Sequence, residues 1–372
     1  MHETGYVSMV QAAVAMMQRV PPSSPVPLTP MVQQARGTAS EALKDPATCD
    51  TRLSVGSYAA ARRAAGAVVR AIDEVLDGHC RNALCVVRPP GHHAGARGLI
   101  PGSVSCGFCV FNSIMVGAAH ALSRRAAEAE AGRHASSSAA PLRVALVDFD
   151  VHHGDGSEEI VRKLLGSGLP PTALFFASIH LYDAGDASFG AFYPGSGGAD
   201  DMAANIINVP VAPLWRRGAL AGKGGGRGVG GGGGGAASPK DCACWGCGRG
   251  EWRAAFSQRI VPALRAFGPD LLLLSSGFDG GCGDIGNSKL DGKDKYHQGL
   301  DLSAADFEWA TEQLLAVAQV CCPGRVVSVL EGGYGTFEPT KATSSGWAVS
   351  RRQLAENVGA HLSALCGVNG RG

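Results

Sequence analysis

Short apolar runs alternate with longer amphipathic stretches along the 372 residues of the chain. The apolar runs have the length of buried strands and predict strands at residues 83–87, 144–147, 173–179, 206–211, 270–276 and 325–330. Apolar residues at helical spacing predict helices at residues 1–20, 50–78, 113–130, 156–165, 252–267, 302–320 and 353–365. Strands that alternate with helices are typical of a doubly wound α/β fold. We therefore expect a single domain over residues 1–372, with a mostly parallel sheet flanked by helices.

The strand predicted at residues 144–147 runs directly into the densest group of polar side chains in the sequence. Residues 148–155 hold three Asp and two His. Successive strand residues point to opposite faces, so Asp148, Asp150 and His152 are expected to share one face. Ligands bind to open α/β sheets at the carboxyl ends of the strands. Two carboxylates and an imidazole at that edge favour a divalent metal such as zinc over a charged turn after a core strand.

Three other predicted strands also end in polar groups. His92 and His93 follow residues 83–87, Asp279 follows residues 270–276, and Tyr334 follows residues 325–330. A zinc ion with an open position would polarise a carbonyl and lower the pKa of its water. A neighbouring His can transfer protons, and a Tyr hydroxyl can donate to the oxyanion of a tetrahedral intermediate. Together these groups indicate hydrolysis of an amide.

Composition and charge exclude several classes of protein. A formal net charge of +1 and a pI near 7.6 give no support for direct nucleic-acid binding. No apolar run approaches the roughly 20 residues that span a bilayer, so we expect no membrane association. His2 and Glu3 stand where a signal peptide would be cationic, and the twelve Cys are too dispersed for a disulfide framework. We therefore expect a protein of the nucleus, the cytoplasm or both, and not a secreted one.

Residues 221–250 interrupt the alternation of strands and helices. This stretch is Gly-rich and contains Cys242, Cys244 and Cys247. Three Cys at this spacing can hold a metal, but no fourth ligand is adjacent, and Gly-rich insertions usually lack a packed structure. We interpret residues 221–250 as a low-complexity Gly/Cys-rich insertion.

Seven motifs in a fixed order resemble the zinc-dependent histone deacetylase family, which includes acetylpolyamine amidohydrolases, and most closely its class II branch. The motifs lie between residues 88 and 334, and the resemblance covers roughly residues 50–365 of the chain. They are Arg88-Pro-Pro-Gly-His-His-Ala94, Cys106-Gly-Phe-Cys109 with Phe111-Asn112, Asp148-Phe-Asp-Val-His-His-Gly-Asp-Gly156, Ser178-Ile-His180, Phe192-Tyr-Pro-Gly195, Ser276-Gly-Phe-Asp279 and Leu330-Glu-Gly-Gly-Tyr334. The resemblance implies an arginase/deacetylase-like fold and zinc-dependent hydrolysis of the acetyl amide of acetyl-lysine in histones or other proteins.

The resemblance also implies roles for individual residues. One zinc per chain would be bound by Asp150, His152 and Asp279. The remaining catalytic residues would be the acid/base pair His92 and His93, oriented by Asp148 and Asp155 respectively, and the oxyanion donor Tyr334. Phe108 and Tyr193 would line a channel for the acyl-lysine stem. A structural potassium ion would involve the side chains of Asp148 and Ser178 and the main-chain oxygens of Asp150, His152 and Ile179. Acetylated proteins such as histone tails, and corepressor proteins, are the implied partners.

Three features depart from the family pattern. The chain begins inside what resembles an early helix, so the family's first strand and first substrate-facing loop are expected to be missing or replaced. The insertion at residues 221–250 is foreign to the pattern. Gly286 stands, by approximate alignment, at a rim position where polyamine-selective members carry an acid. Without that acid a cationic polyamine loses its charge partner, which favours acetyl-lysine in protein as the substrate.

Three alternatives stay open at this point. Acetylpolyamine deacetylation is the nearest, because it uses the same chemistry. An arginase-type enzyme with two manganese ions would need additional Asp ligands, but Gly154, Gly277 and Gly281 occupy those places. A degenerate deacetylase that only binds proteins would fit the departure at the N-terminus, but the full set of site residues opposes it.

Overall fold

A computed structural model describes most of the chain. The described residues are 1–17, 25–35, 49–101, 103, 105–130, 142–185, 190–217, 245–291, 293, 295–340 and 346–367. None of the described helices combines the length and the hydropathy needed to cross a membrane.

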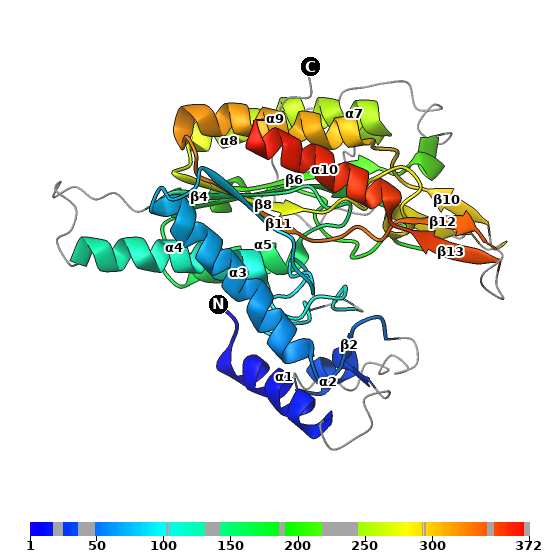
Figure 1. Ribbon diagram of the computed structural model, residues 1–372, viewed down its shortest axis with the longest axis horizontal. Helices are drawn as coiled ribbons and strands as arrows, with labels where there is room; N and C mark the ends of the chain where they lie inside the picture. Colours follow the sequence, from blue (N-terminus) through cyan, green and yellow to red (C-terminus); the bar gives the residue numbers. More distant parts are fainter. Residues whose placement is uncertain are drawn as a thin grey trace.

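A seven-stranded parallel sheet forms the centre of the fold (Figure 1). Its strands are β3 (Asn82–Cys85), β4 (Val144–Asp148), β5 (Leu174–Leu181), β6 (Ile206–Ala212), β7 (Trp245–Cys247), β8 (Leu271–Ser276) and β11 (Val326–Leu330). Their order across the sheet is β3-β11-β8-β4-β5-β6-β7. The last of these strands along the chain, β11, therefore lies between the first, β3, and β8. The predicted parallel α/β sheet is confirmed.

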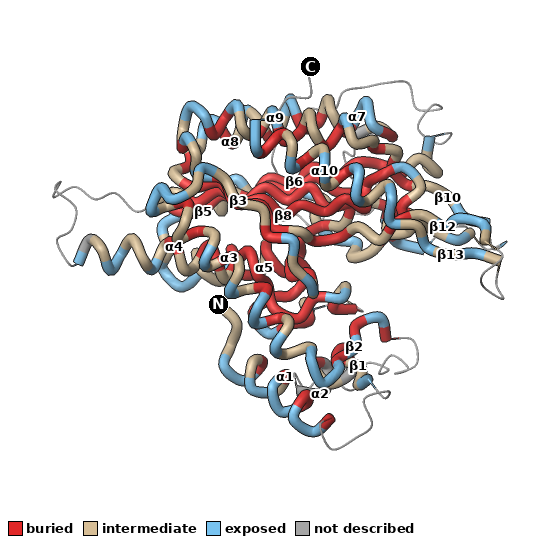
Figure 2. Tube along the Cα trace, in the orientation of Figure 1, coloured by how far each residue is buried: buried red, intermediate tan, exposed pale blue. Residues whose placement is uncertain are grey.

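Helices cover both faces of the sheet, and alternate strand residues contact the two layers. In β8, Leu271 and Leu273 pack in one buried cluster and Leu272 and Leu274 in another, as the period of a strand requires. One layer consists of α3 (Ser57–Leu76), α4 (Ser113–Glu130) and α5 (Asp155–Gly166). The other consists of α7 (Arg249–Ala255), α8 (Val261–Phe267), α9 (Ala304–Cys321) and α10 (Arg352–Cys366). Figure 2 shows the buried strands between these two layers.

The N-terminal residues pack on the end of α3 as a smaller unit with its own core. It comprises α1 (Thr4–Met17), β1 (Val26–Pro27), α2 (Leu28–Ala35) and β2 (Arg52–Leu53). The prolines around residue 25 predict a surface loop there, and this is wrong for the described part. Leu28 begins α2 and is fully buried, because this small core provides an apolar environment that the proline spacing does not reveal.

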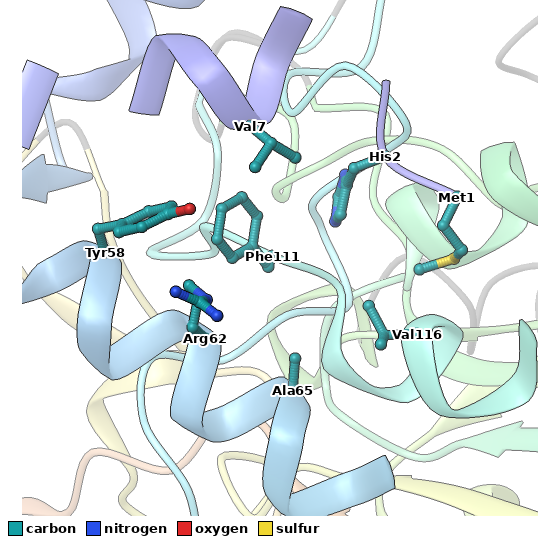
Figure 3. Close-up of a pocket in the computed structure, with 8 residues that line it drawn as sticks. All are labelled: Met1, His2, Val7, Tyr58, Arg62, Ala65, Phe111 and Val116. Atoms are coloured by element: carbon teal, nitrogen blue, oxygen red, sulfur yellow. The ribbon is translucent and has the colours of Figure 1, made fainter. Parts of the chain in front are cut away.

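A pocket of about 310 Å³ lies between this N-terminal unit and the two helices that follow it (Figure 3). It is lined by Met1, His2, Val7, Tyr58, Arg62, Ala65, Phe111 and Val116. The His2 ring closes one side, and its Nε2 accepts a hydrogen bond from the Asn112 N–H (2.9 Å). The pocket shares no lining residue with the polar groups at the strand ends.

The C-terminal part of the predicted insertion at residues 221–250 belongs to the regular fold. Trp245–Cys247 forms β7, which pairs with β6 at the edge of the sheet, and α7 begins at Arg249. A strand of three residues is too short for a periodic pattern to predict. Cys242 and Cys244 lie outside the described residues, so the alternative of a metal held by the three Cys is not tested.

Two hairpins beyond the main sheet were not predicted. β9 (Ser288–Leu290) pairs with β10 (Tyr296–Gln298), and β12 (Thr336–Pro339) pairs with β13 (Trp347–Ser350), both antiparallel. β10, β12 and β13 lie together at one end of the molecule (Figure 1). The helix predicted at residues 252–267 is interrupted between α7 and α8 by a π-helical turn, Phe256–Ile260.

Candidate active site

Four neighbouring strands of the sheet, β3, β11, β8 and β4, bring the polar residues to one edge. His92 and His93 follow β3, Tyr334 follows β11, Asp279 follows β8, and Asp150 and His152 follow β4. Parallel strands end at the same edge, so residues far apart in sequence meet there. His92, His93, Asp150, His152 and Asp279 are called here the carboxylate–histidine cluster.

Asp150, His152 and Asp279 place one ligand atom each within 4.8 Å of the others. His152 Nδ1 lies 3.1 Å from Asp150 Oδ1 and 3.1 Å from Asp279 Oδ2. One ring nitrogen carries at most one proton and cannot donate to both carboxylates. Ligands about 2.1 Å from a tetrahedral zinc lie about 3.4 Å apart, which is close to these separations. Two carboxylates and one imidazole with this spacing fit a zinc ion.

The surrounding backbone holds the two carboxylates but leaves one oxygen unused. The Gly332 N–H donates to Asp150 Oδ2 (2.7 Å), and the Val151 N–H donates to Asp279 Oδ1 (3.0 Å). Asp279 Oδ2 is buried and makes no hydrogen bond. A Cβ at Gly332 would overlap both carboxylates, so only glycine fits there. A buried carboxylate oxygen without a donor is costly unless a cation binds it, which independently supports a metal at this point.

Two Asp–His pairs stand beside the three ligand residues. His92 Nδ1 donates to Asp148 Oδ2 (3.0 Å), and His93 Nδ1 donates to Asp155 Oδ1 (2.7 Å). All four side chains are buried, and the two imidazole rings have their centroids 4.0 Å apart. Because each carboxylate engages Nδ1, each ring presents Nε2 to the remaining space. The structure thus brings together both predicted pairs.

The two histidines differ in their electrostatic surroundings. Burial and, next to it, the positive charge of His92 lower the pKa of His93 to about 4, and the Asp155 carboxylate offsets only part of this. Burial also acts to lower the pKa of His92, but the negative charges of Asp150 and Asp148 outweigh it and raise that pKa well above the usual value. A positive charge on the His92 ring therefore makes protonation of the neighbouring His93 ring less favourable.

Aromatic rings surround the cluster on its open side. Tyr193 packs edge-on against His93 with ring centroids 4.8 Å apart, and Phe108 packs against Tyr334 at 5.6 Å. Phe108 has a left-handed backbone (φ 64°), which is uncommon for a bulky residue, and its N–H donates to Thr51 Oγ1 (2.8 Å). These contacts fix the rings of the two predicted channel residues next to the catalytic groups.

Phe192 has a role that the sequence analysis did not assign. Its ring stacks on His152 with centroids 5.2 Å apart and an interplanar angle of 5°. The side chain is buried in the core that also contains β4 and β5. The motif that contains Tyr193 also contains Phe192, but the sequence does not show which of the two aromatic rings stacks on His152.

The backbone at Tyr334 is held by a buried carboxylate, Asp284, that sequence reasoning also missed. The N–H groups of Tyr334 and Gly335 donate to Asp284 Oδ2 at 3.0 and 2.8 Å. The preceding Gly333 has φ +130°, which L side chains rarely adopt, so the loop turns sharply before the tyrosine. Burial raises the pKa of the Tyr334 hydroxyl well above its usual value. The phenol therefore stays protonated and is able to donate.

Glu331 is the third residue that the sequence analysis missed. It is fully buried, and its Oε2 accepts hydrogen bonds from the Gly91 N–H (2.7 Å) and the His92 N–H (3.2 Å). Its Oε1 accepts from the Ser275 hydroxyl (3.2 Å), on β8. Burial raises the pKa of this carboxyl to about 7. Glu331 thus joins the end of β11 to the turn that carries His92, and its position in the motif with Tyr334 was the sign to follow.

Two of the residues predicted to bind a potassium ion, Asp148 and Ser178, lie side by side in the sheet. Asp148 and Ser178 are register partners on β4 and β5, and both are buried. Ser178 Oγ lies 2.9 Å from His180 Nδ1. Whether these side chains and the main-chain oxygens of Asp150, His152 and Ile179 bind a cation stays a prediction.

The comparisons with known proteins agree with this geometry. A family model described as the histone deacetylase domain matches residues 1–350, so the match begins further toward the N-terminus than the motifs. "Type-2 histone deacetylase 2" of Dictyostelium discoideum is 33% identical over 85% of this chain and 14% of its own length. "Histone deacetylase 15" of Arabidopsis thaliana is 29% identical over 86% of this chain and 44% of its own length. "Histone deacetylase 7" of Homo sapiens is 32% identical over 74% of this chain and 22% of its own length.

A solved structure shares the fold. The crystal structure of the HDA15 HD domain superposes with a TM-score of 0.61 at 23% identity, covering 98% of this chain and 71% of that one. This chain therefore spans less than half the length of the three relatives named above and most of one solved domain. The extent of the family match and the names of these relatives confirm the resemblance found in the motifs. The chain belongs to the histone deacetylase family, in its class II branch.

Proposed function

We propose that this chain hydrolyses the acetyl amide of acetyl-lysine side chains in proteins, with one zinc ion. The observation that carries the proposal is the arrangement at one sheet edge. Two Asp–His pairs lie beside a buried Asp–His–Asp group in which Asp279 Oδ2 has no hydrogen-bond donor. Such a set supplies a cation site and proton carriers side by side, and Tyr334 adds a hydroxyl donor at the same sheet edge.

Asp150, His152 and Asp279 would hold the zinc, and when bound the ion would supply Lewis-acid polarisation of the acetyl carbonyl. A second metal ion of the arginase type does not fit beside it. A Cβ at Gly154 would overlap Asp148 Oδ2, so this position has no room for a further carboxylate ligand. The proposal is therefore a single-metal enzyme.

The two His–Asp pairs move the protons of the reaction. With Nδ1 of each ring held by Asp148 or Asp155, Nε2 of His92 and His93 faces the cleft. One Nε2 accepts a proton from the attacking water, and a histidine then donates a proton to the lysine amine as it leaves. The Tyr334 hydroxyl donates a hydrogen bond to the oxyanion of the substrate and stabilises the tetrahedral intermediate.

Phe108 and Tyr193 provide the walls for the lysine stem. Their rings contact Tyr334 and His93 respectively, so a chain of methylenes between them reaches the proton carriers. Apolar contact along such a stem excludes water from the reacting amide. Phe192, stacked on His152, completes this apolar surround.

The rim favours a protein over a polyamine. Gly286 adjoins the Tyr334 ring and has no side chain to offer a cation. Among the described residues, the nearby acid Asp284 is buried, and its oxygens accept hydrogen bonds from the N–H groups of Gly286, Tyr334 and Gly335. That carboxylate is turned away from solvent, so a cationic amine would find no free charge partner in it.

Further parts of the proposal rest on the resemblance. A potassium ion near Asp148 and Ser178 would brace the loop that carries Asp150 and His152. Acetylated proteins, histone tails among them, and corepressor proteins are the proposed partners, with the nucleus or the cytoplasm as the compartment.

The test is an assay of pure protein on two substrates of equal acetyl concentration, an acetyl-lysine peptide and an acetylated polyamine. Each is measured with and without a hydroxamate, while bound zinc is counted per chain. We expect one zinc, turnover of the peptide, weak turnover of the polyamine and inhibition by the hydroxamate. Full activity after chelation, or two metal ions per chain, would contradict the proposal.

A further inference from the structure

Four apolar side chains on the two hairpins form one exposed surface, called here the hairpin patch. Leu290 and Tyr296 are cross-strand partners in β9–β10, and Phe337 and Val349 are cross-strand partners in β12–β13. The rings of Tyr296 and Phe337 have centroids 5.9 Å apart, which joins the two pairs. Partners directly opposite one another in an antiparallel pair lie on the same face, so the four side chains are contiguous.

The exposure of these side chains is unusual for their size. Leu290, Tyr296, Phe337 and Val349 expose 45%, 58%, 45% and 41% of their surfaces. Figure 2 shows exposed residues along β10, β12 and β13, in contrast to the buried main sheet. A cross-strand pair inside one hairpin is explained by hairpin stability alone. Two such pairs joined by an aromatic contact form a contiguous apolar surface of the kind that marks interaction sites.

The hairpin patch is continuous with the rim of the proposed active site. Thr336, the first residue of β12, follows Tyr334 by two positions, and it forms an isolated bridge with Asp284. The Ile285 N–H donates to the Gly335 carbonyl (2.9 Å), which fixes the start of β9 beside the same loop. Lys289 of β9 donates to the carbonyl of Ala191 (2.8 Å), next to the aromatic pair Phe192 and Tyr193. Both hairpins therefore begin beside the loops that carry Tyr334 and Tyr193.

We propose that the hairpin patch binds an apolar side chain of an acetylated polypeptide, three to five residues from the acetyl-lysine. Phe337 follows Tyr334 by three residues, a span of at most about 10 Å in extended chain. An extended substrate advances about 3.3 Å per residue and covers the same distance in three residues. This inference rests on the proposed function, since it assigns a flanking contact to the substrate of that site. It selects a polypeptide, because a polyamine has no such side chain.

The test compares three substrates. Two are 13-residue peptides with a central acetyl-lysine that differ only in having Leu or Ser at the fourth position on each side. The third is a blocked single acetyl-lysine amide, which is too short to reach the patch. Each is assayed on the parent, on the double variant Tyr296→Thr/Phe337→Thr, and on Val320→Thr. Val320 on α9 is 80% exposed and is the matched control for loss of a surface apolar group.

For the parent, we expect a KM about tenfold lower for the Leu peptide than for the Ser peptide, which corresponds to burying about two methylene groups. The double variant should lose this difference. It should keep the parent kcat on all three substrates and the parent KM on the single amide. Val320→Thr should behave as the parent. Equal KM values for the two peptides on the parent, or an unchanged preference in the double variant, would overturn the inference.

Two further outcomes separate this inference from the proposed function. If no substrate is turned over, the proposed function fails, and fluorescence anisotropy with the same two labelled peptides still tests the patch by binding. Equal dissociation constants on parent and double variant would then overturn it. A dimer that the double variant abolishes, with no change in peptide preference, would assign the patch to a second copy of this chain and likewise overturn it.

Discussion

Two buried polar clusters lie near the end of β8, where Ser276 of one cluster and Asp279 of the other are three residues apart, and the two clusters differ in how many of their polar atoms have partners. His361 Nδ1 lies 2.7 Å from Thr311 Oγ1, its Nε2 lies 2.8 Å from Ser328 Oγ, and Ser328 Oγ lies 2.7 Å from Ser276 Oγ. Thr311 Oγ1 donates to the Phe307 carbonyl (2.6 Å), so it accepts from His361 Nδ1. These four residues are called the His361 cluster. Within it, each of the hydroxyl and ring-nitrogen atoms has a partner.

The carboxylate–histidine cluster lies beyond the end of the same strand and is left incomplete. Asp279 follows Ser276 by three residues, yet its Oδ2 has no donor, and it lies next to the charges of Asp150 and His152. A saturated network stabilises one conformation, whereas an unsaturated buried one needs a ligand. The comparison teaches that burial alone does not reveal the role of a histidine. Whether the polar atoms around it all have hydrogen-bond partners is more informative.

The largest expected effect comes from removing one acid of the incomplete cluster. Loss of a residue that only hydrogen-bonds a metal ligand lowers metal affinity about 10–100-fold. Asp279→Asn removes a proposed ligand itself, so its metal affinity should fall by more than this, and its activity should fall as well. Ser328→Ala in the His361 cluster should do the reverse, lowering thermal stability while zinc content stays near one per chain. Metal analysis and calorimetry on both variants check this, and full zinc in Asp279→Asn would contradict the ligand assignment.

Tyr334 tests catalysis separately from metal binding. Tyr334→Phe removes only the proposed oxyanion donor, so kcat should fall roughly 10²–10³-fold. Zinc content and melting temperature should stay at the parent values, because the ring keeps its contacts with Phe108. If the Phe variant turns over acetyl-lysine peptide as fast as the parent, the hydroxyl has no catalytic role.

The His361 cluster predicts a pH dependence of stability. Burial lowers the pKa of His361 to about 4, below the 6.5 of a free histidine. The unfolded chain therefore binds more protons between these values, and the stabilisation is full above pH 6.5 and is lost as the pH falls toward 4. The contribution is about 3 kcal/mol at 1.36 kcal/mol per pH unit. The free energy of unfolding is measured in urea at pH 7, 6, 5 and 4.5 for the parent and for His361→Gln. The difference between the two proteins should become smaller as the pH falls. A difference that does not change with pH would refute the assignment.

Glu331 lies at the boundary between the two clusters, and its variants separate hydrogen bonding from charge. Glu331→Met removes the acceptor of the Gly91 and His92 N–H groups, at about 1–3 kcal/mol for each buried group left unpaired. Glu331→Gln keeps one oxygen for both N–H groups, and its amide can donate to Ser275. The Met variant should lose unfolding free energy and kcat, and the Gln variant should recover most of both. Equal losses in the two variants would show that the negative charge matters more than the hydrogen bonds.

Much of the fold was predictable because apolar runs and helical periods are local. α4 has the predicted bounds, Ser113–Glu130, and β4 ends one residue beyond the predicted strand. The strand-end residues met as predicted, since parallel strands leave little choice of edge. The motif with Tyr334 pointed to Glu331, but its role was not predictable, because the Gly91 and His92 N–H groups that it binds are far away in sequence. The role of Asp284 was not predictable for the same reason, since the N–H groups of Tyr334 and Gly335 are about 50 residues away. His361 was not singled out either, because a lone histidine in a helical pattern carries no sign of the hydroxyls around it.

The place of β11 in the sheet has a consequence for how the protein is made. β3 pairs with β11 alone among the described strands, and β11 is the last strand of the seven-stranded sheet to be synthesised. Until residues 326–330 emerge from the ribosome, the strand before His92 and His93 has no neighbour, and one edge of β8 stays open. Contacts of such long sequence separation form slowly, and open strand edges invite aggregation. Nascent chains are therefore expected to be prone to aggregation until β11 inserts, and that insertion also brings the Gly332 N–H to Asp150 of the proposed zinc site.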